Sequence, residues 1–197
     1  MTVNEIIDSI LDRAGFITTK VARENGIERH ILSNMSKQGI LVRIKNGVYK
    51  RPSDIVDEYP VIQSNNDKVI FSYGTALYFN DLSDRTPSVI HLSVPQGYNT
   101  SHLKNKFCNL KFHYVKKNVF DLGKILMNSP TGQQIWIYDK ERCICDIVKS
   151  KNVVDMQIFS QAIKSYFKLK NKNIRKLLKY SKLLGVEKEI RNYIEVI

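Results

Sequence analysis

Residues 39–51 read GILVRIKNGVYKR, and this stretch decides how the first third of the chain is expected to fold. ILVRI and VYKR are rich in β-branched and aromatic residues, as strands are. The Asn46-Gly47 pair between them suits a tight turn that needs positive φ at both central positions. The stretch therefore predicts a short β-hairpin. Its two arms carry four basic residues: Arg43, Lys45, Lys50 and Arg51.

Three helical segments are expected before the hairpin. Residues 3–15, VNEIIDSILDRAG, repeat apolar residues with the period of one helix face and end at a glycine, which often closes a helix. Residues 17–27, ITTKVARENGI, offer Thr18 or Thr19 as an N-cap and break at an Asn-Gly pair. A short helix that ends in a glycine turn and is followed at once by another is typical of a helix-turn-helix.

The third segment, ERHILSNMSKQG at residues 28–39, is the most informative one. On a helix of about 3.6 residues per turn, Ile31, Leu32 and Met35 fall on one arc. The opposite arc is polar and holds no carboxylate: Arg29, His30, Ser33, Asn34, Ser36 and Lys37. In a helix-turn-helix the second helix lies in the major groove, where Arg pairs with guanine and Asn with adenine. The plain alternative is a surface helix whose outer face is simply polar.

A strand pair directly after such a helix is the wing of a winged helix-turn-helix, with basic residues that face phosphate or the minor groove. We therefore expect residues 1–52 to form a winged helix-turn-helix DNA-binding domain. Arg29 and Asn34 are expected to read bases. The full predicted DNA-binding set is Thr18, Thr19, Lys20, Arg23, Arg29, His30, Ser33, Asn34, Lys37, Arg43, Lys45, Asn46, Lys50 and Arg51.

The charge balance favours a polyanionic partner. The chain has 31 Lys and Arg against 19 Asp and Glu, a formal net charge of +12, and residues 104–197 hold 20 of the basic side chains. No apolar run approaches the roughly 20 residues of a membrane span, and the first residues carry acids rather than the basic start of a signal peptide. We expect a soluble, cytoplasmic protein that binds nucleic acid and does not enter a membrane.

Residues 52–60 are rich in turn-forming and acidic residues and predict a connection to a second domain at residues 60–197. This domain is expected to hold a helix at residues 75–82, a strand that ends at Pro95, and strands at LKFHYV and IWIYD. Four amphipathic helical segments follow: residues 141–150, 155–170, 174–185 and 187–197. A small sheet covered by helices is the economical arrangement, so the expected fold class is α+β.

Three ordered landmarks of the chain resemble the AbiEi-type antitoxins. LSNMSKQGILVRIKNGVYKRP, residues 32–52, is similar to the end of their amino-terminal winged-helix domain, with its "L…G.L.R…GVY" hallmark. YGTALYFNDLSDRTPSVIHLSVPQGYN, residues 73–99, is similar to their helix-strand unit ending in "P.G". YDKERCICDIV, residues 138–148, resembles their "ERxxxD" helix after a strand.

The resemblance implies a two-domain antitoxin of a type IV toxin-antitoxin system, of the abortive-infection kind that acts in phage defence. It implies that the winged helix represses its own operon by binding inverted repeats in double-stranded promoter DNA. It also implies that the second domain neutralises a nucleotidyltransferase-like toxin without a stable complex between the two. The alternative that does not rest on the resemblance is a stand-alone DNA-binding regulator, or an undetected nuclease, without a toxin partner.

No motif supports an enzyme. Glu141 and Asp146 lie about 140° apart on a helix, so their carboxylates are not expected to converge on one metal or substrate. No nucleophile elbow surrounds Ser72, and no glycine-rich phosphate loop is present. The three cysteines and four histidines show no metal-ligand spacing. We expect no catalytic residue, no metal and no cofactor.

A basic run between residues 164 and 182 predicts a second polyanion site, for DNA or for RNA, with a solvated surface as the alternative. It contains eight cations and no acid: Lys164, Lys168, Lys170, Lys172, Arg175, Lys176, Lys179 and Lys182. Several of these residues share helix faces at a spacing of four. No leucine-rich dimerisation heptad is present, so we expect a monomer in solution that pairs on an inverted repeat.

Overall fold

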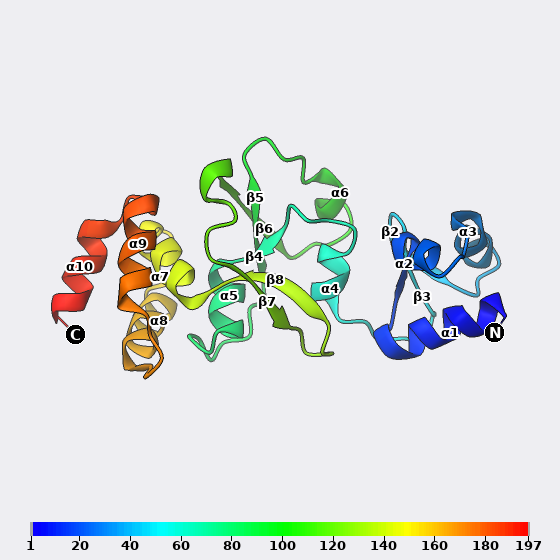
Figure 1. Ribbon diagram of the computed structural model, residues 1–197, viewed down its shortest axis with the longest axis horizontal. Coiled ribbons are helices and arrows are strands. Elements are labelled where there is room, and N and C mark those ends of the chain that lie inside the picture. Colours follow the sequence, from blue (N-terminus) through cyan, green and yellow to red (C-terminus); the bar gives the residue numbers. More distant parts are fainter. Residues whose placement is uncertain (1, 197) are drawn as a thin grey trace. The chain divides into compact units, whose positions relative to one another are not determined.

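The computed structural model describes residues 2–196 and shows helices together with two small β-sheets (Figure 1). The predicted α+β class is confirmed. The pattern of internal contacts divides the chain into two compact units. The first unit runs to Asp67 and includes Met127–Ile135, and the second holds Lys68–Leu126 and the residues from Trp136 onward. The first unit therefore extends beyond the expected boundary at residue 52 and takes in a segment from later in the chain.

The first unit begins with three helices. α1 (Val3–Ala14) opens with a capping box, in which Thr2 and Glu5 each accept a hydrogen bond from the other's backbone N–H. α2 (Thr19–Glu24) and α3 (Arg29–Lys37) follow in the places that the helical patterns predict. One apolar core joins the helices to the hairpin: Ile7, Ile10, Leu11, Ile17, Ala22, Ile27, Leu32, Leu41 and Tyr49.

The hairpin of the first unit is joined by a third strand. β2 (Val42–Lys45) and β3 (Val48–Lys50) are its two arms. β1 (Ile17–Thr18), which the sequence did not lead us to expect, pairs with β3 and gives an antiparallel sheet in the order β1-β3-β2. α4 (Glu58–Gln63), with Asp57 as its N-cap, follows in the segment that was expected to be a connection.

The turn of the hairpin differs from the expected one. Gly47 has a φ of +71°, whereas Asn46 is not among the residues with positive φ. A Cβ atom at Gly47 would lie 2.7 Å from Thr19 Oγ1, so lack of space as well as φ requires glycine here. A β-bulge shifts the register between Arg43 and Lys45, and the regular two-residue turn geometry is lost.

The second unit is built on a sheet of five strands in the order β6-β5-β4-β8-β7. β5 (Ile90–Pro95) runs parallel to β6 (Leu110–Val115) and antiparallel to β4 (Ile70–Phe71). β4 is parallel to β8 (Gln134–Tyr138), and β7 (Lys124–Asn128) lies at the edge. The turn between β7 and β8, with the adjoining strand residues, is the segment counted with the first unit.

Helices complete the second unit. They are α5 (Tyr73–Phe79), α6 (Ser101–Lys104), α7 (Lys140–Lys149), α8 (Met156–Lys168), α9 (Ile174–Leu184) and α10 (Glu187–Val196). α7 is the central one, because eight consecutive residues of it are buried and it packs against α5, α8 and α9. Within the described part of the chain, every helix is too short or too polar to cross a bilayer.

Candidate nucleic-acid interface

The turn between α2 and α3 fixes the position of α3 in the first unit. Gly26 adopts a φ of +73°, and Ile27, which follows it, is buried. Leu32 of α3 is fully buried, while Ile31 and Met35 pack against the same core. These contacts leave the opposite side of α3 turned outward, as the helical period predicts.

We call this outward side the α3 face. It consists of Arg29, His30, Asn34 and Lys37, which are exposed, with Ser33 half-buried beside them. α3 contains no acidic residue. His30 Nδ1 lies 3.0 Å from the carboxylate of Glu28, so this histidine has a partner within the chain. The side chains of Arg29, Asn34 and Lys37 form no hydrogen bond or ion pair with the described residues, and are therefore available to a ligand.

The predicted DNA-binding residues on α2 and at its N-cap differ in exposure. Thr18 is 6% exposed, and its Oγ1 accepts a hydrogen bond of 3.1 Å from the N–H of Val21 as the N-cap of α2. A buried capping hydroxyl is not available to DNA, which corrects the prediction for Thr18. Thr19 is half-buried, whereas Lys20 and Arg23 are exposed.

Lys45 is buried, which corrects its prediction as a phosphate contact. It is 7% exposed, and its Nζ donates hydrogen bonds to the carbonyl oxygens of Ile62 (2.9 Å) and Ser64 (2.8 Å). The bulge after Arg43 is the physical reason, because the inserted residue turns Lys45 to the opposite face from the one that strict alternation would give. Burial lowers the pKa of Lys45 to about 8.

The two basic residues at the end of the hairpin also bind within the first unit. Arg51 donates hydrogen bonds of 2.7 Å to the carboxylates of Asp8 and Asp12 on α1, and these bonds raise the pKa of Arg51. Lys50 is half-buried and donates to the carbonyl oxygen of Asp54 at 2.6 Å. Both partly exposed cations therefore have hydrogen-bond partners within this unit.

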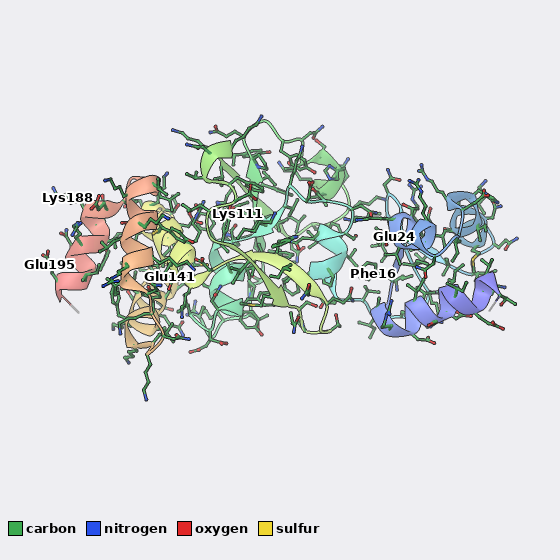
Figure 2. All side chains as sticks on the ribbon, viewed as in Figure 1. Phe16, Glu24, Lys111, Glu141, Lys188 and Glu195 are labelled. Atoms are coloured by element: carbon green, nitrogen blue, oxygen red, sulfur yellow. The ribbon has the colours of Figure 1, made fainter. Side chains whose placement is uncertain are left out.

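Arg43 and Asn46 are the predicted hairpin residues that remain exposed. The guanidinium of Arg43 donates a hydrogen bond to Asn46 Oδ1, which holds the two side chains together at the tip. Figure 2 shows the side chains that project from these elements, with Glu24 labelled at the end of α2. The exposed part of the predicted DNA-binding set thus comes from α2, the α3 face and the hairpin tip.

The basic run of the second unit is also only partly free. Six of its cations are exposed: Lys164, Lys168, Lys170, Arg175, Lys179 and Lys182. Lys172 is half-buried and donates to the carbonyl oxygen of Leu169 at 3.2 Å. Lys176 lies 2.9 Å from the carboxylate of Asp139 and 3.5 Å from that of Glu141. The predicted second polyanion site is therefore reduced to the six exposed cations on α8, α9 and the turn between them.

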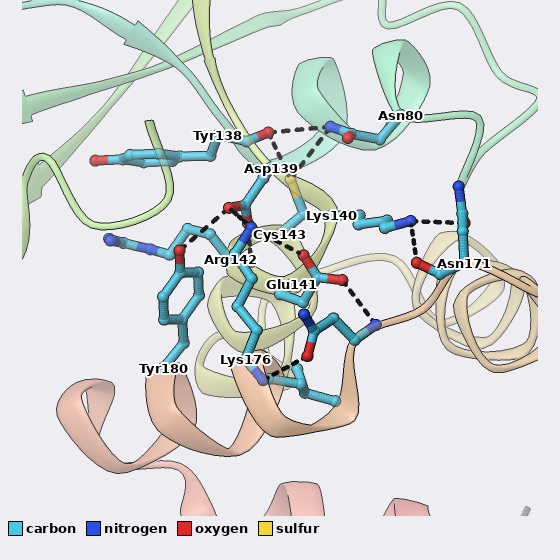
Figure 3. Close-up of polar contacts among 12 residues, drawn as sticks. Asn80, Tyr138, Asp139, Lys140, Glu141, Arg142, Cys143, Asn171, Lys176 and Tyr180 are labelled. Atoms are coloured by element: carbon cyan, nitrogen blue, oxygen red, sulfur yellow. Dashed lines mark hydrogen bonds and ion pairs between the residues drawn. The ribbon is translucent and has the colours of Figure 1, made fainter. Parts of the chain in front are cut away.

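The contacts of Lys176 belong to a buried polar network at the start of α7 (Figure 3). The carboxylate of Asp139 caps α7 through the N–H of Arg142 and accepts a hydrogen bond from Tyr180. Glu141 accepts hydrogen bonds of 3.2 Å from the hydroxyl of Tyr166 and from the backbone N–H of Asn173. These contacts explain why charged residues are tolerated at buried positions.

The two acids suggested as catalytic candidates have different partners. Whereas Glu141 binds Tyr166 and Asn173, Asp146 Oδ1 accepts a hydrogen bond of 2.9 Å from Arg142 Nε. Burial raises the pKa of Asp146, and the adjacent Arg142 opposes that shift. Among the described residues, no three His, Cys, Asp or Glu side chains gather as metal ligands would.

One histidine pair was missed by sequence reasoning. His91 on β5 and His113 on β6 lie side by side, with 3.0 Å between His91 Nδ1 and His113 Nε2. Burial lowers the pKa of His91 to about 4 and that of His113 to about 3. Their separation of 22 positions in the sequence gave no signal, because their proximity depends on the parallel register of β5 and β6.

The fold is similar to that in a crystal structure of the RV2827C protein from Mycobacterium tuberculosis. The match has a TM-score of 0.51 at 12% sequence identity, over 98% of this chain and 80% of that chain. At this identity the likeness concerns the fold alone. No protein-family model matches the chain, and no curated protein does. The comparisons support the mixed α+β fold.

Proposed function

We propose that the first unit is a winged helix-turn-helix that binds double-stranded DNA, with α3 in the major groove and the β2-β3 hairpin as the wing. The observation that carries this proposal is the α3 face. It presents Arg29, Asn34 and Lys37 outward on a helix without acids, with each of these side chains free of partners among the described residues. Such donors match base edges and phosphates.

The exposed residues are assigned separate roles. Arg29 and Asn34 read bases, since their planar groups form bidentate contacts with guanine and adenine. Lys20, Arg23, Lys37 and Arg43 hold phosphates and supply the salt-dependent part of the affinity. Lys45, Lys50 and Arg51 take no part, because their cationic groups bind within the first unit.

We further propose that the chain is the antitoxin and autorepressor of a type IV toxin-antitoxin operon in the cytoplasm. In this proposal the winged helix binds inverted repeats at the promoter, and the second unit neutralises a nucleotidyltransferase-like toxin without a stable complex. The resemblance of residues 32–52, 73–99 and 138–148 to the AbiEi-type antitoxins supports it. The protein then acts by binding rather than by catalysis, and the exposed cations of α8 and α9 extend its contact with DNA or RNA.

A growth assay tests the antitoxin role. The neighbouring reading frame is expressed alone, with the full-length chain, and with an Arg29→Ala/Asn34→Ala variant. We expect toxicity alone, and rescue by both forms, because the α3 face is assigned to DNA and not to neutralisation. Absence of toxicity, or absence of rescue by the full-length chain, would leave a stand-alone DNA-binding regulator.

Point variants are preferable to a truncated chain in this assay. Thr131, in the turn between β7 and β8, donates a hydrogen bond of 3.0 Å to the carboxylate of Asp57. Gln133, in the same turn, donates one of 2.8 Å to the carbonyl oxygen of Ala14. All four residues belong to the first unit. Removal of the first 59 residues would take away these partners and confuse loss of folding with loss of function.

A further inference from the structure

A pocket in the second unit lies beyond the carboxyl ends of the parallel strands β5 and β6, next to α7 and α9. Its volume is about 280 Å³, just below the roughly 300–1,000 Å³ of small-molecule sites. Its lining includes Tyr73, Tyr114, Lys116, Arg142, Asp146 and Lys149. The carboxyl edge of parallel strands is a common place for ligands in α/β sheets.

Asp146 gives the pocket an acceptor without a partner. The residue is 4% exposed, and its Oδ1 accepts a hydrogen bond from Arg142 Nε, but its Oδ2 is buried and has no hydrogen-bond partner among the described residues. Buried carboxylate oxygens are nearly always bonded, so an orphaned one on a residue that lines a pocket points to a missing donor. An N–H group of a ligand would supply it.

Arg142 holds this carboxylate in a fixed position. Its Nη1 donates to the carbonyl oxygens of Val119 (2.7 Å) and Leu122 (2.9 Å), while its Nε donates to Asp146. The guanidinium therefore joins α7 to the segment after β6, and it binds Oδ1 of Asp146 while Oδ2 keeps no hydrogen-bond partner among the described residues. The acceptor is pre-positioned, which reduces the cost of ligand binding.

Cations outnumber acids around the pocket. Asp146 is the one acid among its lining residues, against Lys116, Arg142 and Lys149. Lys116 is exposed, and its ammonium group has no partner among the described residues. Lys149 is also exposed and donates one hydrogen bond of 3.2 Å, to the carbonyl oxygen of Leu184. These two ammonium groups favour a ligand that carries negative charge.

Two tyrosines complete the walls. Tyr73 stacks on His113 with 3.7 Å between ring centroids, and its hydroxyl lies 3.3 Å from Ser150 Oγ. Its φ of +47° is uncommon for a bulky residue, and such strain concentrates at ligand sites. Tyr114 is 50% exposed, so its ring offers a face on which a planar group can stack.

We propose that this pocket binds a mononucleotide, whose base donates an N–H to Asp146 and lies against a tyrosine ring while its phosphate binds Lys116 and Lys149. A nucleotide combines the N–H donor, the planar ring and the negative charge that the three parts of the pocket require. The volume suits one nucleotide rather than a longer nucleic acid. The proposal goes beyond the function proposed above, since no lining residue belongs to the α3 face or to the basic run.

Calorimetric titration of the full-length chain with AMP, GMP, CMP and UMP tests the proposal, with the matching nucleosides and inorganic phosphate as separate probes. We expect saturable binding of at least one nucleotide, at about tenfold or more higher affinity than either its nucleoside or phosphate, because each half of the ligand contributes contacts. Absence of saturable binding by all four nucleotides would overturn the proposal. Equal affinity for phosphate alone would also overturn it.

Two neighbouring lysines provide a matched pair of variants. Lys116→Glu reverses a charge in the pocket lining, whereas Lys117→Glu reverses an exposed charge one residue later that does not line the pocket. We expect Lys116→Glu to weaken nucleotide binding by about tenfold or more and Lys117→Glu to change it little. Equal effects of the two variants would mean that the nucleotide binds elsewhere and would overturn the proposal.

Asp146→Asn tests the contact to the base. The amide oxygen can stay on Arg142, and the NH₂ group then replaces the orphaned acceptor with a donor. We expect the advantage of the nucleotide over inorganic phosphate to disappear in this variant, while its melting temperature shows that it is folded. An unchanged preference for the nucleotide in the folded variant would contradict the assignment of Asp146.

Discussion

Lys45 Nζ donates a hydrogen bond of 2.9 Å to the carbonyl oxygen of Ile62, and so ties the β2-β3 hairpin to α4 within the first unit. Lys45→Met removes this bond and the one to Ser64. We expect the free energy of unfolding to fall by about 1–3 kcal/mol, because two carbonyl oxygens lose a charged donor. The affinity of the folded protein for DNA should not change. Urea denaturation and a DNA titration check the two parts.

Arg43→Ala is the matched opposite, since Arg43 lies two residues earlier on the same strand but is exposed. We expect a change in stability within about 0.5 kcal/mol. The slope of log affinity against log salt concentration should become less steep by about 1, as for the loss of one phosphate contact. If Lys45→Met reduced the slope as Arg43→Ala does, the separation of structural from DNA-binding cations on the hairpin would be wrong.

Arg29 and Lys37 lie at the two ends of α3 and are given different roles. We expect Arg29→Ala to cost about 1–3 kcal/mol of binding to the promoter and little on random DNA, because it removes a base contact. Lys37→Ala should weaken binding to both DNAs alike and make the slope of log affinity against log salt concentration less steep by about 1. Titrations on promoter and scrambled duplexes measure both. If Arg29→Ala weakened binding to the two duplexes equally, the base-reading role of Arg29 would be refuted.

The His91–His113 pair predicts how stability depends on pH. Burial lowers the folded pKa of both histidines, to about 4 and about 3, from 6.5. The unfolded chain therefore binds more protons between pH 6.5 and 4, and stability is lost as the pH falls through this window. Each histidine contributes a slope of up to about 1.4 kcal/mol per pH unit. Chemical denaturation between pH 7 and 4.5 should show this loss of stability. In the His91→Gln/His113→Gln variant, the free energy of unfolding should depend less on pH. If the parent and the variant lost stability in parallel, the histidine pair would not be the origin of the pH dependence.

Gly123 and Gly97 allow backbone strain to be separated from a clash. Both have positive φ, at +80° and +82°. A Cβ atom at Gly123 would lie 2.7 Å from Arg142 Cβ, whereas one at Gly97 would meet nothing within 4 Å. We expect Gly97→Ala to destabilise by about 1 kcal/mol through its φ, and Gly123→Ala by about 1–3 kcal/mol more through overpacking. Thermal unfolding measures both variants. If Gly97→Ala and Gly123→Ala lost the same free energy of unfolding, the loop around Gly123 would have to move aside freely.

The exposed cations of α9 test the second polyanion site. Arg175→Glu/Lys179→Glu/Lys182→Glu reverses three charges that are exposed, and it spares Lys176, which binds Asp139. We expect weaker nucleic-acid binding and a less steep salt dependence than in the parent chain. The matched control reverses three exposed lysines of the same unit outside the run: Lys106, Lys111 and Lys117. If the first variant kept both promoter affinity and antitoxicity, the basic run would be a solvated surface.

The local features of the first unit could be predicted because their signals lie within a few residues. The outward and inward sides of α3 follow from the helical period, and the hairpin from its two β-type runs around Asn46-Gly47. The prediction of Lys45 as a phosphate contact failed, because a bulge of one residue reverses the face of every later side chain on the strand. No pattern in residues 39–51 announces that bulge.

The remaining features depend on residues that are distant in sequence. β1 and β4 have only two residues each, too few for any period to appear. The pocket requires Asp146 of α7 and Lys116, which follows β6, to line one cavity although they are distant in sequence. The spacing of Glu141 and Asp146 gave no indication that one Asp146 oxygen would remain without a partner.

The measurement that tests the central claim most directly is a fluorescence titration of the full-length chain on its own promoter duplex and on a scrambled duplex of the same length, over a series of salt concentrations. We predict binding to the promoter about 10³-fold tighter or more than to the scrambled duplex, with affinities on both that fall steeply as salt increases. Equal affinity for the two duplexes across the salt series, or no binding to either, would contradict the assignment of the α3 face as a DNA-reading surface.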